Sequence, residues 1–276
     1  MSILSTLCDG QIKGKKSIAV LIDPDKADDT NHLQSLINLA NENCIDFFFV
    51  GGSLVTTTNL SEVVKQIKES VTIPIVLFPG NSIQIEPNAD ALLFLSLISG
   101  RNPELLIGQH VVAAPIIRNT RIEVIPTGYM LINSGRITSV AYISNTTPIP
   151  DDKYSLAACT AMAGEMLGLQ TIYMDAGSGA EIPVNAKMIS AVRKAVKVPL
   201  IIGGGLNTVR KAITALEAGA DTIVVGNALE KNPDLLSEVS DKVYEWNQSV
   251  AEGLRQSQTP TSSGTVDKVR KRDTGG

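Results

Sequence analysis

The sequence lacks the features that mark membrane-spanning, secreted or zinc-binding proteins. Its hydrophobic runs fall short of the ~18–20 residues that a helix needs to cross a bilayer. Its beginning has no charged head followed by a long apolar stretch, so we expect no signal peptide. The three cysteines, Cys8, Cys44 and Cys159, are too far apart for a CxxC pair or a metal-ligand spacing. We therefore expect reduced thiols and a cytoplasmic protein.

Excess charge and aromatic side chains are also scarce. The formal net charge is -4, and aromatic residues make up 4% of the chain. This weakly acidic balance is untypical of general nucleic-acid binders, so we expect no nucleic-acid partner. The chain has instead 43% hydrophobic residues, which is enough for a substantial core. One α/β barrel of roughly 250 residues would account for nearly all of the sequence.

Short hydrophobic runs rich in Val, Ile and Phe alternate with longer amphipathic stretches. Such runs are typical of parallel strands buried on both faces. We expect strands at residues 17–23, 46–50, 74–78, 90–96, 122–132, 171–175, 198–203 and 221–226. Helical spacing of apolar residues predicts helices at 30–43, 59–69, 154–168, 185–197, 207–218 and 234–250. The alternation predicts a parallel α/β fold, and eight strands favour a closed TIM (β/α)8 barrel over an open doubly wound sheet.

Two segments interrupt this alternation. Residues 133–153 are rich in turn-forming residues and end NTTPIPDDK, which predicts a long functional or mobile loop after the fifth strand. Residues 255–276 lack an apolar face and are rich in Ser, Thr, Gly and charge, which predicts a disordered tail. We therefore expect a single catalytic barrel domain over residues 1–254 and a flexible tail over 255–276.

Three glycine-rich turns each follow an expected strand and precede an expected helix. They are AGSGA at 176–180, GGGL at 203–206 and GNAL at 226–229. Glycine lets backbone N–H groups approach an oxyanion closely, and a helix N-terminus adds favourable partial charge. Many barrels hold a phosphate at the loops after strands seven and eight, so the turns predict a phosphate site. Its candidate ligands are Ser178, Gly179, Gly203, Gly204, Gly205, Gly226 and Asn227.

Carboxylates stand at the ends of the first and sixth expected strands. Asp23 and Asp25 occur in LIDPDK, and Ser53 follows the second strand in VGGSL. Mg2+ prefers a few oxygen ligands with water and substrate phosphate, so Asp23 and Ser53 could hold it, or could simply cap the next turns. Asp175 ends the sixth strand, with Tyr173 two residues earlier on the same side. Asp175 could accept a proton from a substrate hydroxyl, or could bond backbone amides alone.

Eight sequence blocks in order resemble the geranylgeranylglyceryl phosphate synthase family, which includes archaeal and bacterial enzymes. They are LIDPDK, FFFVGGSL, LFPGNS, AAPIIRNTRIEVIPTGYMLINSG, YISNTTPIP, YMDAGSGA, PLIIGGGL and VVGNALE. The resemblance covers residues 10–250 and implies a prenyltransferase on a TIM barrel. Such an enzyme joins sn-glycerol 1-phosphate to a long prenyl diphosphate, here geranylgeranyl diphosphate, with Mg2+. The products are an ether lipid phosphate and diphosphate.

The resemblance also implies a role for each matching residue. Asp23 and Ser53 would bind the metal, and Asp175 would be the base at the glycerol hydroxyl. The glycerol phosphate would contact Tyr173, Met174, Asp175, Ala176, Gly177, Ser178, Gly179, Gly203, Gly204, Gly205, Gly226 and Asn227. One residue departs from the family pattern, because Asp175 stands where the family has a glutamate, which is one methylene longer.

The prenyl tail would need an apolar groove. Other functions also remain possible from the sequence. Candidate groove residues, which could equally be barrel core, are Phe78, Leu95, Leu97, Tyr129 and Met130. The donor could be longer, as in a heptaprenylglyceryl phosphate synthase. The barrel could be a sugar-phosphate isomerase or aldolase, although strands six and seven lack a lysine, or a non-enzymatic regulator that senses glycerol phosphate. We further expect a homo-oligomer and at most a transient contact with a membrane surface.

Overall fold

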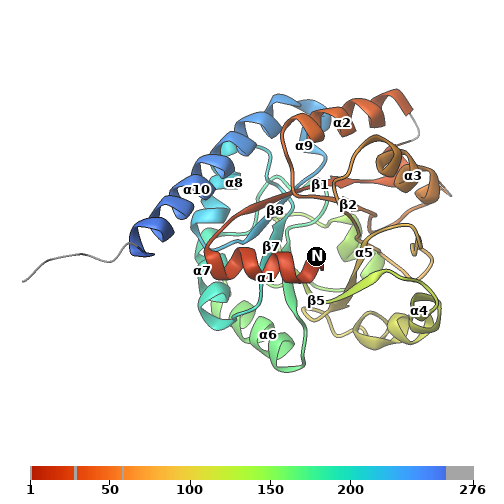
Figure 1. Cartoon of the computed structure of the whole chain (residues 1–276). Coiled ribbons are helices and arrows are strands. Elements are labelled where there is room, and N and C mark those ends of the chain that lie inside the picture. Colours follow the sequence, from red (N-terminus) through yellow and green to blue (C-terminus); the bar gives the residue numbers. More distant parts are fainter. Residues whose placement is uncertain (1, 28–29, 58, 259–276) are drawn as a thin grey trace, which may run out of the picture.

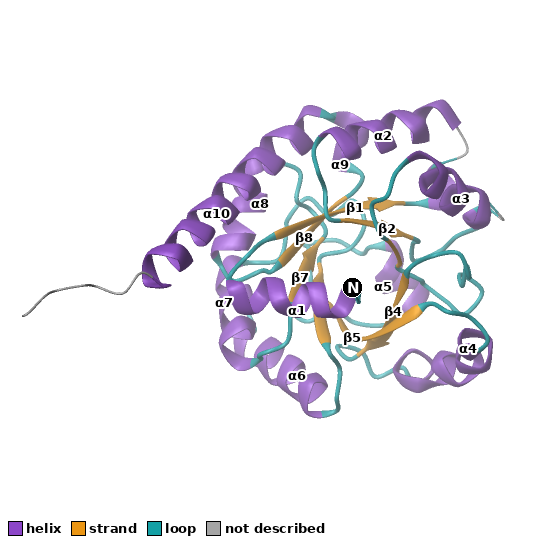
Figure 2. Ribbon diagram, in the orientation of Figure 1, coloured by secondary structure: helices purple, strands orange, loops and turns teal. Residues whose placement is uncertain are grey.

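The computed structural model describes residues 2–27, 30–57 and 59–258, and its strands close into a ring (Figures 1 and 2). The strands are β1 (Ser17–Ile22), β2 (Phe47–Val50), β3 (Ile75–Leu77), β4 (Ala91–Leu97), β5 (Glu123–Leu131), β6 (Thr171–Asp175), β7 (Leu200–Gly203) and β8 (Thr222–Val225). Each strand pairs in parallel with its neighbour in sequence, and β8 pairs with β1. The predicted TIM barrel is confirmed, and the open doubly wound sheet is wrong.

Helices surround the ring and connect its strands (Figure 2). They are α1 (Ile3–Lys13), α2 (Thr30–Glu42), α3 (Leu60–Ser70), α4 (Gln109–Arg118), α5 (Ser139–Ser144), α6 (Tyr154–Met166), α7 (Ala186–Ala195), α8 (Val209–Glu217), α9 (Ala228–Lys231) and α10 (Asp234–Gln258). A 3-10 turn, η1 (Pro24–Lys26), and a π-helical turn, η2 (Glu104–Gly108), complete the described elements. The sequence did not predict α1, α4, α5 or α9. In α4 the apolar pattern is broken by Gln109 and His110, and Pro115 lies inside the helix.

Helix α1 lies across the end of the barrel that faces the viewer in Figure 1. Its Ile3 and Leu7 are buried against side chains of the barrel interior. The carboxylate of Glu123, the first residue of β5, accepts hydrogen bonds from the backbone amides of Ile3 and Leu4 at 2.7 and 2.9 Å. These bonds satisfy the free amides at the start of the helix. Because α1 covers the N-terminal ends of the strands, ligands must reach the barrel from the other end.

The core has two layers, as the alternation of side chains along each strand requires. Phe47 and Phe49 of β2 belong to the cluster inside the barrel. Phe48 lies between them in sequence and belongs to the larger cluster between strands and helices. In β6, Tyr173 faces inward and Met174 outward in the same way. A side chain at the C-terminal end of a strand can therefore reach the barrel mouth only if it lies on the inner face.

The two segments that interrupted the sequence pattern are more ordered than we expected. Residues 133–153 contain the short helix α5, and the amide of Asn133 donates to the carbonyl of Ile149 at 2.8 Å. Helix α10 continues to Gln258, so the first four residues of the expected tail are helical. Residues 259–276 lie outside the described part of the chain. Within the described ranges, the helices are too short or too polar to traverse a bilayer.

Candidate active site

A polar cavity of about 970 Å3 opens at the C-terminal ends of the strands. Its wall includes residues from all three glycine-rich turns, the end of β1 and the segment between β5 and α6. The predicted site residues that line it are Asp23, Ser53, Tyr173, Asp175, Gly177, Ser178, Gly179, Gly204, Gly205, Gly226 and Asn227. The barrel closure thus brings together side chains that lie as far apart in sequence as Asp23 and Asn227.

Direct contacts tie the turns to one another and to their surroundings. The side-chain amide of Asn227 donates to the Ser178 hydroxyl at 3.0 Å, which joins the turn after β8 to the turn after β6. The Arg136 guanidinium donates to the Gly179 carbonyl at 2.6 Å, which joins the segment before α5 to the same turn. Turns of this kind present successive backbone N–H groups to an anion. The backbone amides of these turns are therefore suited to bind a phosphate in the cavity.

Two glycines of the middle turn are required by the space around them. Gly204 has a φ of 77°, and a Cβ there would lie 2.6 Å from Oδ1 of Asp175 and 2.8 Å from the amide nitrogen of Gly177. A Cβ at Gly203 would lie 2.3 Å from the hydroxyl of Tyr173. A larger residue at either position would displace the side chains at the end of β6. The glycines after β7 thus make room for the carboxylate and the tyrosine.

Asp175 is the buried acid of this site. Its Oδ2 accepts a hydrogen bond from the Tyr129 hydroxyl at 2.6 Å, and its Oδ1 accepts one from the Gly177 amide at 2.7 Å. Burial raises the pKa of Asp175 above its ordinary value, and the two hydrogen bonds act in the opposite direction. Burial, followed by the nearby Asp175 carboxylate, raises the pKa of Tyr129 and Tyr173 well above the usual range. Asp175 is therefore the group in this cluster that can take up a proton.

Asp23 lines the other side of the cavity, against the turn after β2. A Cβ on Gly52 would lie 3.5 Å from Oδ1 of Asp23, and that oxygen accepts the amide of Asp25 at 3.2 Å. Burial, more than any other cause, raises the pKa of Asp23. Asp25 itself is turned away, because its carboxylate accepts the amides of Thr56 and Thr57 at 2.9 and 3.0 Å. The hydroxyls of both threonines also donate to it. Burial acts to raise the pKa of Asp25, but the hydrogen bonds from Thr56 and Thr57 outweigh it and hold that pKa at about 2.

The donor set around Asp23 fits a hard cation that is only partly held by protein. Within residues 2–27, 30–57 and 59–258, no three His, Cys, Asp or Glu side chains gather to hold a metal by themselves. Asp23 and Ser53 offer a carboxylate and a hydroxyl on the same wall of the cavity. Mg2+ accepts such a partial shell when substrate phosphates and water complete it. A cation beside Asp23 would also offset the cost of ionising a carboxylate that burial disfavours.

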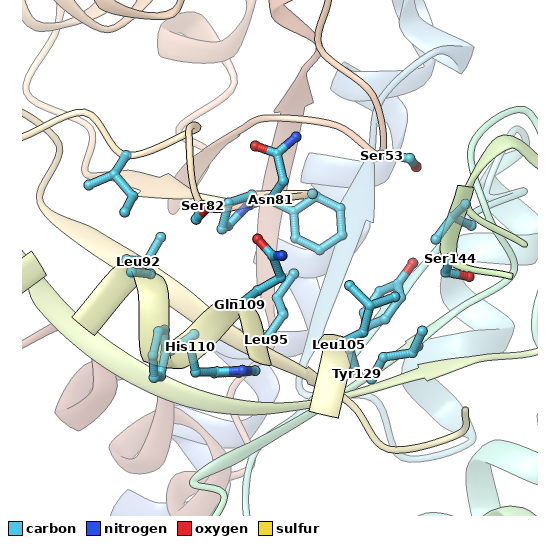
Figure 3. Close-up of a pocket in the computed structure, with 18 of the residues that line it drawn as sticks. Ser53, Asn81, Ser82, Leu92, Leu95, Leu105, Gln109, His110, Tyr129 and Ser144 are labelled. Carbon is cyan, nitrogen blue, oxygen red and sulfur yellow. The ribbon is translucent and has the colours of Figure 1, made fainter. Parts of the chain in front are cut away.

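A second, mostly apolar cavity of about 140 Å3 lies between β3, β4, β5 and α4. In Figure 3, Ser53 and Ser144 stand toward one side of this cavity, and Leu92 and His110 toward the other. Four residues line both this apolar cavity and the polar one. They are Gly52, Ser53, Phe78 and Ile143. Tyr129 lines the apolar cavity and donates to Asp175, which lines the polar one, so this hydrogen bond links the walls of the two cavities.

Some of the predicted residues do not lie in these cavities. Met174 and Ala176 are buried in the layer between strands and helices, and Gly203 lies behind the Tyr173 hydroxyl. Met130, a candidate for the apolar groove, also belongs to the outer layer. These residues alternate with inward-facing neighbours, so their side chains line neither cavity. For Met130 this is the barrel-core alternative, and contact of Met174, Ala176 or Gly203 with glycerol phosphate stays a prediction. The other candidates for the groove line the apolar cavity, and they are Phe78, Leu95, Leu97 and Tyr129.

Sequence reasoning missed several residues that line the cavities. Arg136 and Thr138 precede α5, and Lys231 ends α9; all three line the polar cavity. His110 lines the apolar cavity, and its Nδ1 is buried without a hydrogen-bond partner. The position of Arg136 inside the turn-rich segment 133–153 was the one available signal, because a cation in a functional loop is a candidate anion ligand. The others depend on how distant segments meet.

Comparisons with known proteins identify the family. The model of the PcrB family matches residues 11–244. The chain is 53% identical over 249 residues to a geranylgeranylglyceryl phosphate synthase of Spirosoma linguale, covering 90% of this chain and 100% of that protein. It is 40% identical over 224 residues to a geranylgeranylglyceryl phosphate synthase of Korarchaeum cryptofilum, covering 81% of this chain and 91% of that protein.

A solved structure agrees with these sequences. The geranylgeranylglyceryl phosphate synthase of Thermoplasma acidophilum, crystallised with its substrate sn-glycerol-1-phosphate, superposes with a TM-score of 0.83 at 29% identity. The match covers 89% of this chain and 99% of that one. The family model spans far more than half of the chain, and both relatives are matched over nearly their whole length. The chain therefore belongs to the PcrB family and, with these relatives, to the enzymes of the geranylgeranylglyceryl phosphate synthase type.

Proposed function

We propose that this enzyme joins sn-glycerol 1-phosphate to geranylgeranyl diphosphate, forming a prenylglyceryl phosphate ether and diphosphate. One observation carries the proposal: a polar cavity with glycine turns adjoins an apolar cavity, and the Tyr129–Asp175 hydrogen bond links their walls. A phosphorylated alcohol suits the first cavity and a hydrocarbon chain suits the second. The names of the Spirosoma and Korarchaeum relatives, and the substrate of the Thermoplasma enzyme, support the same pair of substrates. The cavities favour neither a sugar-phosphate isomerase nor an aldolase, which have no use for the apolar one.

In the proposed reaction the glycine turns hold the phosphate and direct the free primary hydroxyl of glycerol toward Asp175. Asp175 takes the proton of that hydroxyl as the oxygen bonds to the first carbon of the prenyl chain. The bond from that carbon to diphosphate breaks, and diphosphate leaves with the electron pair. Tyr129 keeps the carboxylate oriented by its hydrogen bond, and Phe78 packs against the rings of Tyr129 and Tyr173 at centroid distances of 5.9 and 5.0 Å. Holding both substrates in place can lower the barrier by several kcal/mol.

Asp23 and Ser53 are the residues that would hold Mg2+ in this scheme. When bound, the cation would neutralise the charge that develops on the leaving diphosphate. The Lys26 ammonium, which lies near Asp23, donates to the Glu230 carboxylate at 2.9 Å, so this lysine is already paired. Asp23 and Ser53 are thus the metal ligands that we propose, and we expect the reaction to depend on Mg2+.

Other expectations remain predictions. The donor could be longer than geranylgeranyl diphosphate, as in a heptaprenylglyceryl phosphate synthase. The homo-oligomer and the cytoplasmic location rest on the sequence alone. A non-enzymatic sensor of glycerol phosphate would have no need of the apolar cavity, and the assay below separates it from the synthase.

The test is a transfer assay with the full chain. Purified protein would be incubated with sn-glycerol 1-phosphate, Mg2+ and radiolabelled prenyl diphosphates of increasing length. We expect label to appear in a phosphate ether that extracts into butanol, with the best rate for the geranylgeranyl donor. Chelation of the metal should abolish the product, and its return should restore it.

Two controls make the result specific. sn-Glycerol 3-phosphate should be a poor acceptor, because the chiral carbon fixes which hydroxyl faces Asp175 when the phosphate is held. Asp23→Asn should weaken the response to Mg2+ while leaving the binding of glycerol phosphate alone intact. No ether from any donor would remove the synthase proposal, and binding of glycerol phosphate without turnover would favour the sensor.

A further inference from the structure

Large apolar side chains are exposed around the mouth of the polar cavity. Ile137 is 82% exposed and Tyr142 is 79% exposed, and Leu54 and Ile143 are each about half exposed. All four line the polar cavity. Leu54 follows β2, and the other three belong to the segment between β5 and α6. A contiguous set of exposed apolar side chains around a ligand site marks an interaction surface rather than ordinary surface scatter.

The segment that carries these side chains is held in place by hydrogen bonds. Arg136 donates to the Gly179 carbonyl, and the side-chain amide of Asn102 donates to the Ser144 carbonyl at 3.0 Å. The amide of Ile149 donates to the Leu131 carbonyl at 2.9 Å, which ties the end of the segment to β5. Because both ends and α5 are anchored, the outward direction of Ile137 and Tyr142 is part of the fold. Water contact with these side chains costs free energy that some partner could recover.

The charges at the mouth differ in sign from the chain as a whole. Of the exposed charged side chains that line the cavity, Lys26 is paired with Glu230. The remaining exposed charges are two cations, Arg136 and Lys231, and one anion, Glu181. The Lys211 ammonium also lies beside Glu181 and donates to its backbone carbonyl at 2.7 Å. The rim is therefore net cationic on a chain whose formal net charge is -4. Exposed apolar side chains together with an excess of cations around the same mouth complement a surface that is anionic outside and apolar beneath.

The position of this rim also decides which occupant fits. A rigid partner, including a second copy of the chain, would close the cavity through which both substrates must pass. A lipid bilayer would cover the same side chains and still let a substrate move between membrane and cavity, since its molecules are mobile. The apolar cavity begins at Ile143, Phe78 and Ser53, directly inside the rim.

We propose that the rim formed by Leu54, Arg136, Ile137, Tyr142 and Ile143 docks on the surface of an anionic lipid bilayer. Ile137 and Tyr142 enter the headgroup region, and Arg136 and Lys231 lie at the lipid phosphates. The prenyl donor then reaches the apolar cavity, and the ether lipid leaves it, without crossing water. This inference rests on the proposed function for its biological sense, but docking itself needs no catalysis.

The test is flotation of the full chain with vesicles, without substrate. Vesicles of phosphatidylcholine containing phosphatidylglycerol would be compared with vesicles of phosphatidylcholine alone. We expect the protein to float with the anionic vesicles, less with the neutral ones, and less at high salt. The double variant Ile137→Ser, Tyr142→Ser should lower the vesicle partition coefficient about tenfold or more, which corresponds to about 1.4 kcal/mol of lost apolar burial.

A matched control uses equally exposed apolar side chains elsewhere. Met166 and Leu167, 78% and 80% exposed, lie at the end of α6 and line neither the polar nor the apolar cavity. Met166→Ser, Leu167→Ser should float as the natural chain does, and thermal unfolding would verify that both double variants are folded. Equal loss in the two variants would overturn the proposal.

Further outcomes separate this inference from the proposed function. Asp175→Asn should float normally, because docking does not use the carboxylate. Product from detergent-dispersed donor together with no flotation on either kind of vesicle would overturn the docking surface and leave the synthase intact. Flotation of a chain that makes no ether would do the reverse. A dimer that the double variant at Ile137 and Tyr142 converts to monomer, with no vesicle binding, would assign the rim to a second copy.

Discussion

The two ends of the barrel differ in how completely their buried polar groups are hydrogen-bonded or paired. At the N-terminal end, Lys16 donates to the Ala220 carbonyl at 2.7 Å, and its ammonium lies 5.2 Å from the centre of the Trp246 ring. Asp221 accepts from Arg193 and from the Leu200 amide, at 2.7 and 2.8 Å. Each of these buried charges is matched, as stability requires.

At the C-terminal end, the same matching is incomplete. The hydroxyls of Ser134 and Thr138 are buried without hydrogen-bond partners. Several glycines of the turns hold a left-handed backbone. Such features cost stability in the free protein and become useful when a ligand supplies the missing partners. The closed end of the barrel thus stabilises the fold, so that polar groups at the open end can remain without partners until a ligand binds.

The largest effect on activity at the open end should come from Asp175→Asn, which keeps the size of the side chain and removes the base. We expect turnover to fall by about 10²–10⁴-fold, with the melting temperature nearly unchanged. Asp175→Glu, which keeps a carboxylate, should retain far more activity than the asparagine variant. Loss of the two activities to the same extent would mean that the charge of Asp175 is not what matters.

The pH dependence of the natural enzyme tests the same carboxylate. Asp175 must be ionised to accept a proton, and its pKa is raised by burial. As pH falls through that raised pKa, turnover should decline, and the decline should begin at a higher pH than for an ordinary aspartate. A rate-against-pH profile measured at saturating substrate would show this. A profile that is flat until the usual range of an exposed aspartate would contradict it.

A smaller effect is expected from Gly204→Ala. The added Cβ meets Asp175 and the Gly177 amide, so both glycerol phosphate binding and turnover should suffer, with a loss of unfolding free energy of about 1–3 kcal/mol. Gly168→Ala is the matched control, because Gly168 also has a positive φ, of 92°, but nothing lies within 4 Å of its Cβ position. That variant should lose a similar or smaller amount of stability and keep its KM for glycerol phosphate. Equal KM changes in the two would reject the argument from space.

A substitution at the closed end should change stability and leave activity unchanged. Arg193→Met should lower the free energy of unfolding by about 3 kcal/mol, because it leaves the buried Asp221 carboxylate without its charged partner. Turnover per folded molecule should stay the same, since Arg193 lies at the far end from the site. Lys65→Gln, which removes an exposed pair with Glu69 at 3.9 Å, is the control and should change stability little. Chemical denaturation would measure both.

The smallest effect should follow from Thr138→Val at the open end. Thr138 is buried with an unpartnered hydroxyl, close to where a Cβ on Gly177 would lie. Replacing that hydroxyl by a methyl group of similar size should raise the free energy of unfolding by about 1 kcal/mol. If the hydroxyl serves the bound phosphate, the KM for glycerol phosphate should rise at the same time. A loss of stability would mean that the hydroxyl has a partner in the free protein.

Much of this barrel was predictable from sequence. The strands, the helices other than α1, α4, α5 and α9, and the three glycine turns follow from local patterns, because side-chain period and backbone sterics act over a few residues. Asp23, Ser53 and Asp175 were placed at the barrel mouth for the same reason. The side chains of Met174, Ala176 and Met130 lie in the outer layer instead, because neighbouring side chains on a strand face opposite ways and a continuous motif does not show which of them face the cavity.

Sequence alone determined where each strand ends and which residue types stand there. Only the tertiary structure decided that Tyr129 would reach Asp175 across 46 positions, that Arg136 would bond the turn at Gly179, and that Asp25 would be taken up by Thr56 and Thr57. The physical reason is that local pattern specifies the direction of a side chain within its own element. Which side chains meet across the mouth depends on the closure and register of the whole ring, to which every strand contributes.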